Sequence, residues 1–138
     1  MKFTFLRRSL IPLSVIFVVA GVASCTDESS YMPRIAAMRD SIFSAYPANV
    51  ASVTIKVEDK TNLKIVLGGG ELFKFAPDKR QSMANDLGLM AIRIFGKDSY
   101  LRTGKLIVTK DERNSSESPA DGVVSEINID SLKKISAK

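Results

Sequence analysis

Two neighbouring segments with period-two alternation constrain the fold of this chain more than any other feature. In residues 53–57 and again in residues 63–67, apolar side chains occupy every second position. Such alternation is typical of strands with one buried face, and a polar turn between two of them predicts a hairpin. The inward positions are Val53, Ile55, Val57, Leu63, Ile65 and Leu67, and the outward ones include Thr54, Lys56, Glu58 and Lys64.

A first helix is expected before this hairpin. Pro33 suits a first helical turn, and Pro47 ends the pattern because proline cannot continue a helix. Between them, Ile35, Met38 and Ile42 recur at helical spacing.

A second helix is predicted from Pro77 to a stop at Gly96. Its apolar stripe comprises Met83, Ala84, Leu87, Ala91 and Ile94, widened by Leu89 and Met90. Gly88 lies in mid-helix, where glycine costs about 1 kcal/mol relative to alanine. We therefore expect Gly88 to allow close approach of this helix to the sheet.

Two more strands complete the pattern, one around residues 106–108 and one over residues 123–129. The polar segment 111–121 between them is expected to be a mobile loop, and Asp130 to cap a last helical turn. The order is α-β-β-α-β-β in a single domain, residues 31–138. That order predicts an α+β two-layer sandwich, with helices on one face of a mainly antiparallel sheet.

The first 24 residues have the features of a signal peptide. Lys2, Arg7 and Arg8 form a positive start, and an apolar run from Leu10 to Ala20 follows. This run is short for a transmembrane helix, which needs roughly 20 apolar residues.

The end of this segment, Val22-Ala23-Ser24-Cys25, resembles the lipobox of bacterial lipoproteins. The resemblance covers residues 1–25 only. It implies cleavage before Cys25 and lipidation of that cysteine, so that acyl chains such as palmitate hold the protein on the membrane. Cys25 is then an anchor and not a nucleophile.

Residues 25–30 are expected to be the lipidated cysteine and a tether. Thr26 differs from the aspartate that, in enterobacterial lipoproteins, favours inner-membrane retention, and Thr26-Asp27-Glu28 resembles the acidic export signal of some surface lipoproteins. The expected location is the outer membrane, either exposed at the cell surface or facing the periplasm.

The charge balance changes when the signal is removed. The whole chain has 20 Lys and Arg against 15 Asp and Glu, but residues 26–138 have 17 against 15. The remaining excess is small, so a nucleic-acid partner is not expected. The membrane, through acylated Cys25, and an envelope protein complex are the expected partners.

Composition excludes several kinds of chemistry. The chain has no histidine and one cysteine, which excludes His-dependent nucleophile pairs, an internal disulfide and multi-cysteine metal sites. Gly68-Gly69-Gly70 lacks the Gly-Lys-Ser/Thr of a phosphate loop. The acidic residues Asp111, Glu112, Glu117, Asp121 and Glu126 lack the spacing of a calcium loop. Neither a metal nor a cofactor is expected.

One cluster of basic residues surrounds the second helix and the turn after it. Its members are Lys79, Arg80, Arg93, Lys97, Arg102 and Lys105. They are candidates for an anion-binding or partner-binding face, although a solvated polar face is the alternative interpretation.

The function expected from these features is that of a lipid-anchored, non-enzymatic binding or accessory protein. The alternative is a small hydrolase-like enzyme that uses carboxylate, lysine or tyrosine groups, which can act as acids and bases without histidine. A pocket where such groups converge would favour the enzyme, and an exposed patch would favour the binding module.

Overall fold

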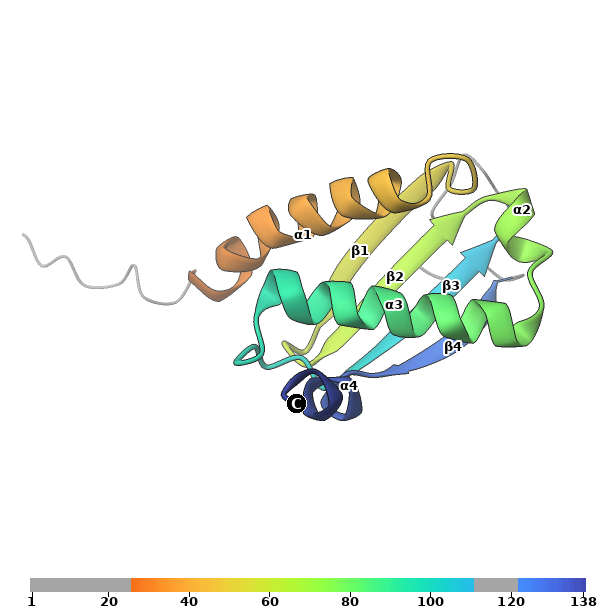
Figure 1. Ribbon diagram of the computed structural model, residues 1–138. Coiled ribbons are helices and arrows are strands. Elements are labelled where there is room, and N and C mark those ends of the chain that lie inside the picture. The colour runs from red at the N-terminus through yellow and green to blue at the C-terminus, as the bar shows by residue number, and fades with distance from the viewer. Residues whose placement is uncertain (1–25, 111–121) are drawn as a thin grey trace, which may run out of the picture.

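The computed structural model describes residues 26–110 and 122–138 (Figure 1). Residues 1–25 and 111–121, which include Cys25 and the expected polar loop, lie outside the described part. The elements in chain order are α1 (Thr26–Ala45), β1 (Ser52–Glu58), β2 (Asn62–Gly68), α2 (Gly70–Phe73), α3 (Pro77–Phe95), β3 (Thr103–Thr109), β4 (Val123–Asn128) and α4 (Ile129–Ser136).

The four strands form one open sheet in the order β1-β2-β3-β4. The β1–β2 and β3–β4 pairs are antiparallel, whereas the central β2–β3 pair is parallel. Parallel neighbours need a crossover, and α3 supplies it by carrying the chain back along the sheet. The predicted α+β class is therefore confirmed, with a mixed sheet whose outer pairs are antiparallel.

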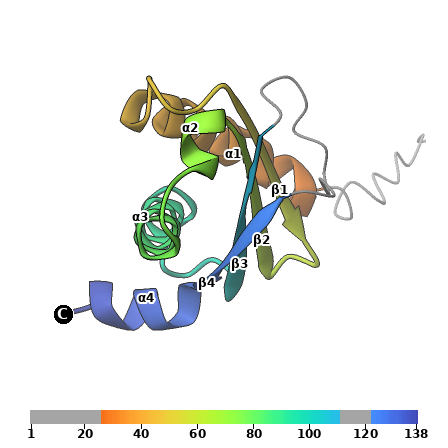
Figure 2. The ribbon, with the colours of Figure 1, turned by 90° about the vertical axis from the view of Figure 1, so that its right-hand side faces the viewer.

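The helices cover one face of this sheet. Figure 2 shows α2, α3 and α4 on the same side of the strands, and α1 packs beside α3 and over β1. The core between the layers is continuous and apolar. Its fully buried large side chains include Met38, Ile42, Leu63, Ile65, Leu67, Leu72, Leu87, Leu101, Leu106, Ile127 and Ile129.

The predicted alternation in the hairpin is confirmed. Leu63, Ile65 and Leu67 of β2 belong to the core, and their β1 partners in register are only partly buried, as expected for an edge strand. The other face of the sheet carries the residues predicted to point outward, and it also carries Val66 and Ile107, which are buried (1% and 8% exposed).

Several boundaries differ from the prediction. Helix α1 begins at Thr26, so it takes in residues 26–30 and has Pro33 inside it rather than in its first turn. Helix α4 is capped by Asn128, whose side chain accepts a hydrogen bond from the backbone N–H of Ser131 at 3.0 Å. Asp130 lies within the first turn of α4 and is not its cap.

The glycine triplet ends β2 and begins the short helix α2, which the sequence patterns did not predict. Gly69 lies against the backbone of residue 49: a Cβ there would come within 2.3 Å of the Asn49 carbonyl oxygen. The triplet therefore has a packing role between the α1–β1 connection and the sheet.

Gly88 sets the distance between α3 and the elements beneath it, as expected for a glycine in mid-helix. A Cβ on Gly88 would lie 2.5 Å from Leu132 Cδ1 and 2.7 Å from Ile127 Cγ2. The leucine tip can rotate away, but the branched Ile127 side chain is held in β4 with a relative exposure of 1%. Any larger residue at position 88 must push α3 away from β4 and α4.

We therefore expect Gly88→Ala to lower the free energy of unfolding by about 1–2 kcal/mol, because overpacking outweighs the gain in helix propensity. Urea denaturation of the protein measures this change. Gly70→Ala is the matched control, since a Cβ there meets no heavy atom within 4 Å. An equal response of the two variants would contradict the close approach at Gly88.

Candidate functional site

The sheet face opposite the helices carries a row of three lysines. In the strand register Lys56 of β1 lies opposite Lys64 of β2, Lys64 lies opposite Lys105 of β3, and Lys105 lies opposite Glu126 of β4. Neighbouring strands are about 4.8 Å apart, so the row crosses three strands in about 10 Å. We call Lys56, Lys64 and Lys105 the lysine row.

This arrangement has an electrostatic cost. Like charges directly opposite each other on one sheet face destabilise the pairing. Glu58 offsets part of it, since its carboxylate lies 3.7 Å from the Lys64 ammonium, and Glu126 flanks the row at its other end.

A hollow of about 460 Å³ lies over β2 and β3 beside the lysine row. Lys64 and Lys105 line it, together with Asn62 and Thr103, whose side chains are hydrogen-bonded to each other. Val124, which is 51% exposed, forms an apolar margin. The hollow therefore combines two ammonium groups with amide and hydroxyl groups, and the Glu58 carboxylate, which is paired with Lys64, lines it as well.

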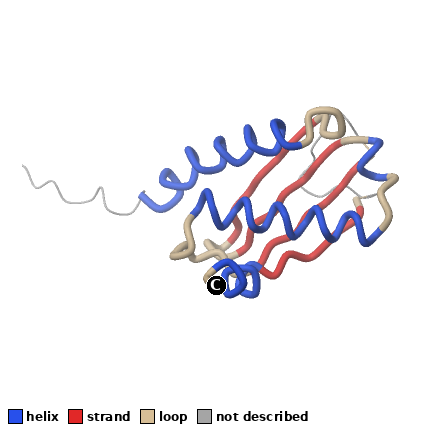
Figure 3. Tube along the Cα trace, viewed as in Figure 1, coloured by secondary structure: helices blue, strands red, loops and turns tan. Residues whose placement is uncertain are grey.

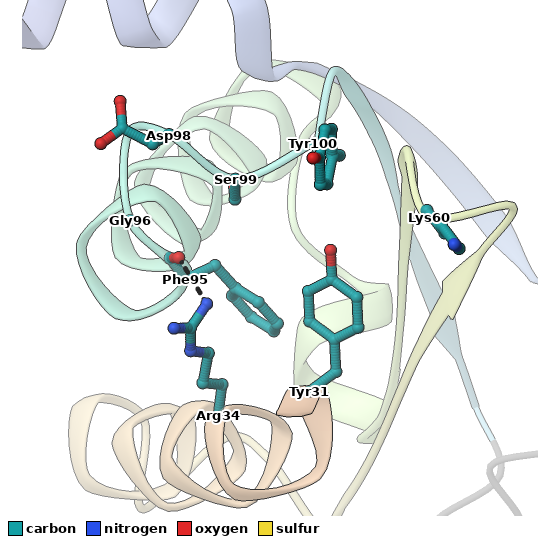
Figure 4. Close-up of a pocket in the computed structure, with 8 residues that line it drawn as sticks. All are labelled: Tyr31, Arg34, Lys60, Phe95, Gly96, Asp98, Ser99 and Tyr100. Atoms are coloured by element: carbon teal, nitrogen blue, oxygen red, sulfur yellow. Dashed lines mark hydrogen bonds between the residues drawn. The ribbon is translucent and has the colours of Figure 1, made fainter. Parts of the chain in front are cut away.

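A second hollow, of about 390 Å³, opens at the end of the molecule where α1 begins (Figure 4). We call it the tyrosine hollow. It is lined by Tyr31, Arg34, Lys60, Phe95, Gly96, Asp98, Ser99 and Tyr100. Figure 4 shows the Tyr31 hydroxyl directed toward Tyr100 and the Asp98 carboxylate directed outward, away from the arginine.

Helix α1 builds one wall of the tyrosine hollow by closing the end of α3. The Arg34 guanidinium donates to the carbonyl oxygen of Phe95 at 2.9 Å, and the Tyr31 and Phe95 rings lie 5.7 Å apart. The carbonyls of the last helical turn have no partner within the helix and form the negative end of its dipole. Arg34 therefore gives a carbonyl at the end of α3 a hydrogen-bond partner, and it holds α1 against that end of the helix.

Helix α4 holds the opposite wall, the loop after α3. The Lys133 ammonium donates to the carbonyl oxygens of Ser99 at 2.8 Å and Leu101 at 2.7 Å. In return, Lys97 donates to the carbonyl oxygen of Ser136 at 3.0 Å. The Ser99 hydroxyl, in contrast, is buried and has no hydrogen-bond partner in the described part of the chain.

Lys60 reaches the tyrosine hollow from the turn between β1 and β2, which lies at the same end as the start of α1 (Figure 3). Asp59 and Lys60 have φ of 51° and 62°, and Thr61 donates its N–H to the carbonyl oxygen of Glu58 at 3.2 Å. Two central residues with positive φ define a type I′ turn, which favours Asn and Gly. A lysine there is conformationally strained.

The six basic residues predicted as one face do not gather on one surface. Lys79 lies 3.8 Å from the centre of the Phe75 ring, and Arg80 donates to the carbonyl oxygen of Phe73 at 3.2 Å. Both are in the first turns of α3, about 20 Å along the helix from Arg93.

The remaining members are also dispersed. Arg93 and Lys97 line a small hollow beside α4, and Lys97 is held by Ser136 as described. Arg102 precedes β3 and is exposed, whereas Lys105 points to the open face of the sheet. Of the six, only Lys105 belongs to the lysine row.

The alternating pattern already placed Lys56 and Lys64 on the outward face. The pattern did not give the strand order. Because β2 and β3 pair in parallel, Lys105 lies beside Lys64. Lys60, in turn, was part of a polar turn, and nothing in the sequence showed its left-handed backbone.

Tyr46, which lines neither hollow, has its pKa raised by burial and by the nearby Asp86 carboxylate. Within residues 26–110 and 122–138, no group of three or more Asp, Glu or Cys side chains gathers as metal ligands. Over the same residues no helix has the length and hydropathy to cross a membrane. Compared with family models, curated proteins and solved structures, the chain matches none of them.

The strain at Lys60 gives a direct test of this geometry. We expect Lys60→Gly to raise the free energy of unfolding by about 0.5–1 kcal/mol, because glycine adopts positive φ without a steric cost. Lys74→Gly is the matched control: Lys74 is exposed and has φ of −79°, so its replacement should lower stability. Urea midpoints that fall in both variants would contradict the left-handed turn.

Proposed function

We propose that this protein is a lipid-anchored bacterial envelope protein whose small α+β domain acts as a non-enzymatic binding or accessory module. The observation that carries the proposal is the order of features in residues 1–25: positive start, apolar run, small residues and Cys25. Each acyl methylene contributes about 0.8 kcal/mol to membrane binding, so two or three chains on one cysteine hold a protein firmly.

The start of α1 supports a short connection to the membrane. Helix α1 includes Thr26, the residue that follows Cys25 in the sequence, so the described helix leaves little room for a tether between the proposed anchor and the domain. A domain held in this way works beside the membrane that carries it. Thr26 and the acidic pair Asp27 and Glu28 favour the outer membrane, at the cell surface or facing the periplasm.

The lysine row is the surface best suited to a partner. It lies on the sheet face that the helices leave uncovered, and it keeps three positive charges in adjacent register positions despite their repulsion. An acidic surface of an envelope protein complex would relieve that repulsion and gain from charge complementarity. We therefore place the proposed basic binding face on the sheet, and not around α3, where the sequence suggested it.

Lipidation is tested by mass spectrometry of the protein purified from bacterial membranes. We expect a chain that begins at Cys25 and carries diacylglyceryl and amide-linked acyl mass. Cys25→Ala should abolish incorporation of labelled palmitate and leave the precursor uncleaved, because this is the only cysteine. An unmodified Cys25 in mature protein would contradict the proposal.

Partner binding is tested by crosslinking in intact cells, followed by affinity capture and mass spectrometry. We expect Lys105→Gln to recover several-fold less of the captured envelope partner than the wild type, because one buried charge contact is lost. Lys74→Gln, which removes one charge beyond α2, should recover as much as the wild type. Equal recovery of the partner with the wild type and with both variants would show that the lysine row is not part of the binding surface.

A further inference from the structure

The tyrosine hollow lies close to the lipid anchor that the proposed function places on Cys25. At 1.5 Å per residue, Tyr31 is about 8 Å and Arg34 about 12 Å along α1 from its first residue, Thr26. Since Cys25 directly precedes that residue, both side chains stay within about this distance of the bilayer surface, whatever the tilt of the helix. The lipid headgroup layer, about 5–8 Å thick, is therefore within their reach.

The groups in the tyrosine hollow match an anionic oxygen ligand. Arg34 uses one N–H for the Phe95 carbonyl, and a guanidinium has five. The Lys60 ammonium adds a second positive charge. The buried Ser99 hydroxyl, without a hydrogen-bond partner in the described chain, adds a donor that a ligand oxygen would satisfy.

The two tyrosines point to a lipid surface as the source of that ligand. Tyr100 is 73% exposed at the mouth of the hollow, and the Tyr31 hydroxyl is directed toward it (Figure 4). Tyrosine is enriched where a protein meets lipid headgroups, because its ring is apolar and its hydroxyl is polar. An exposed tyrosine ring would not strengthen the binding of a soluble phosphate.

Lys60 supplies an independent argument. Its left-handed backbone is a cost that glycine or asparagine would avoid, and such strain concentrates at functional positions. The position delivers a positive charge to the rim of the tyrosine hollow. A role for the Lys60 charge at this rim would explain why a lysine occupies a strained position.

We propose that the tyrosine hollow binds the phosphate of an anionic lipid headgroup in the membrane that anchors Cys25. Arg34 contacts the phosphate and Ser99 donates a hydrogen bond to it. Lys60, on the other side of Tyr31 (Figure 4), adds positive charge at the rim, and Tyr31 and Tyr100 lie at the headgroup level. The contact orients the domain on the membrane, with α2 and the opposite end of the sheet directed away from it. This inference rests on the proposed lipid anchor, but its site can be tested without the anchor.

The test uses the mature chain with Cys25→Ser, which carries no lipid. Sedimentation with vesicles of phosphatidylcholine, with and without phosphatidylglycerol, measures its binding. We expect binding to the anionic vesicles only, and roughly fivefold weaker binding for Lys60→Gly, as for the loss of one basic residue at an anionic surface. Lys74→Gly, an identical substitution beyond α2, should change the binding less than twofold.

The outcomes separate the possibilities. Weaker binding by Lys60→Gly, together with its raised urea midpoint, supports the proposal, because a more stable protein cannot have lost binding by unfolding. Equal losses in the two glycine variants would overturn it in favour of a general charge effect. Competition by glycerol phosphate at the concentration of vesicle headgroups would also overturn it, since the site would then be one for a soluble phosphate. Failure of lipidation at Cys25 leaves this measurement unaffected and overturns only the anchor.

Discussion

The close packing of α3 against the sheet is the constraint on which the rest of this structure depends. Gly88 lets the helix lie against Ile127 and Leu132, and the leucine and alanine side chains on either side of it complete the core. The same helix is the crossover that makes β2 and β3 parallel. Its position therefore decides both the layer structure of the domain and the order of residues on the open face of the sheet.

Two surfaces follow from that packing. The parallel β2–β3 register aligns Lys64 with Lys105 and so creates the lysine row. At the end of α3, Arg34 donates a hydrogen bond to the carbonyl of Phe95, which brings the start of α1 to the wall of the tyrosine hollow. One surface faces away from the helices and the other lies near the proposed anchor, so the proposed membrane contact and the proposed protein partner would use different surfaces.

Local patterns were sufficient for much of the fold. Alternation predicted the hairpin, and Pro77 and Gly96 gave the ends of α3, because these residues act through their own backbone geometry. The start of α1 and the cap at Asn128 were missed, since several residue types can begin a helix. The lysine row depends on the pairing of Lys64 with Lys105, 41 residues further along the chain, and no local pattern predicts that pairing. The tyrosine hollow depends on tertiary contacts among three separate segments, α1, the β1–β2 turn and residues 95–100, and had no signal in the sequence at all.

Labels at the two ends of the domain measure the orientation that we propose for it on a membrane. Because the only native cysteine would carry the lipid, one introduced cysteine is a unique site for a fluorophore in the lipidated protein. Asp98→Cys lies at the rim of the tyrosine hollow, and Glu71→Cys lies in α2. In anionic vesicles with a quencher on the headgroups, the account predicts strong quenching of the label at 98 and weak quenching of the label at 71. Equal quenching of the two labels would contradict it.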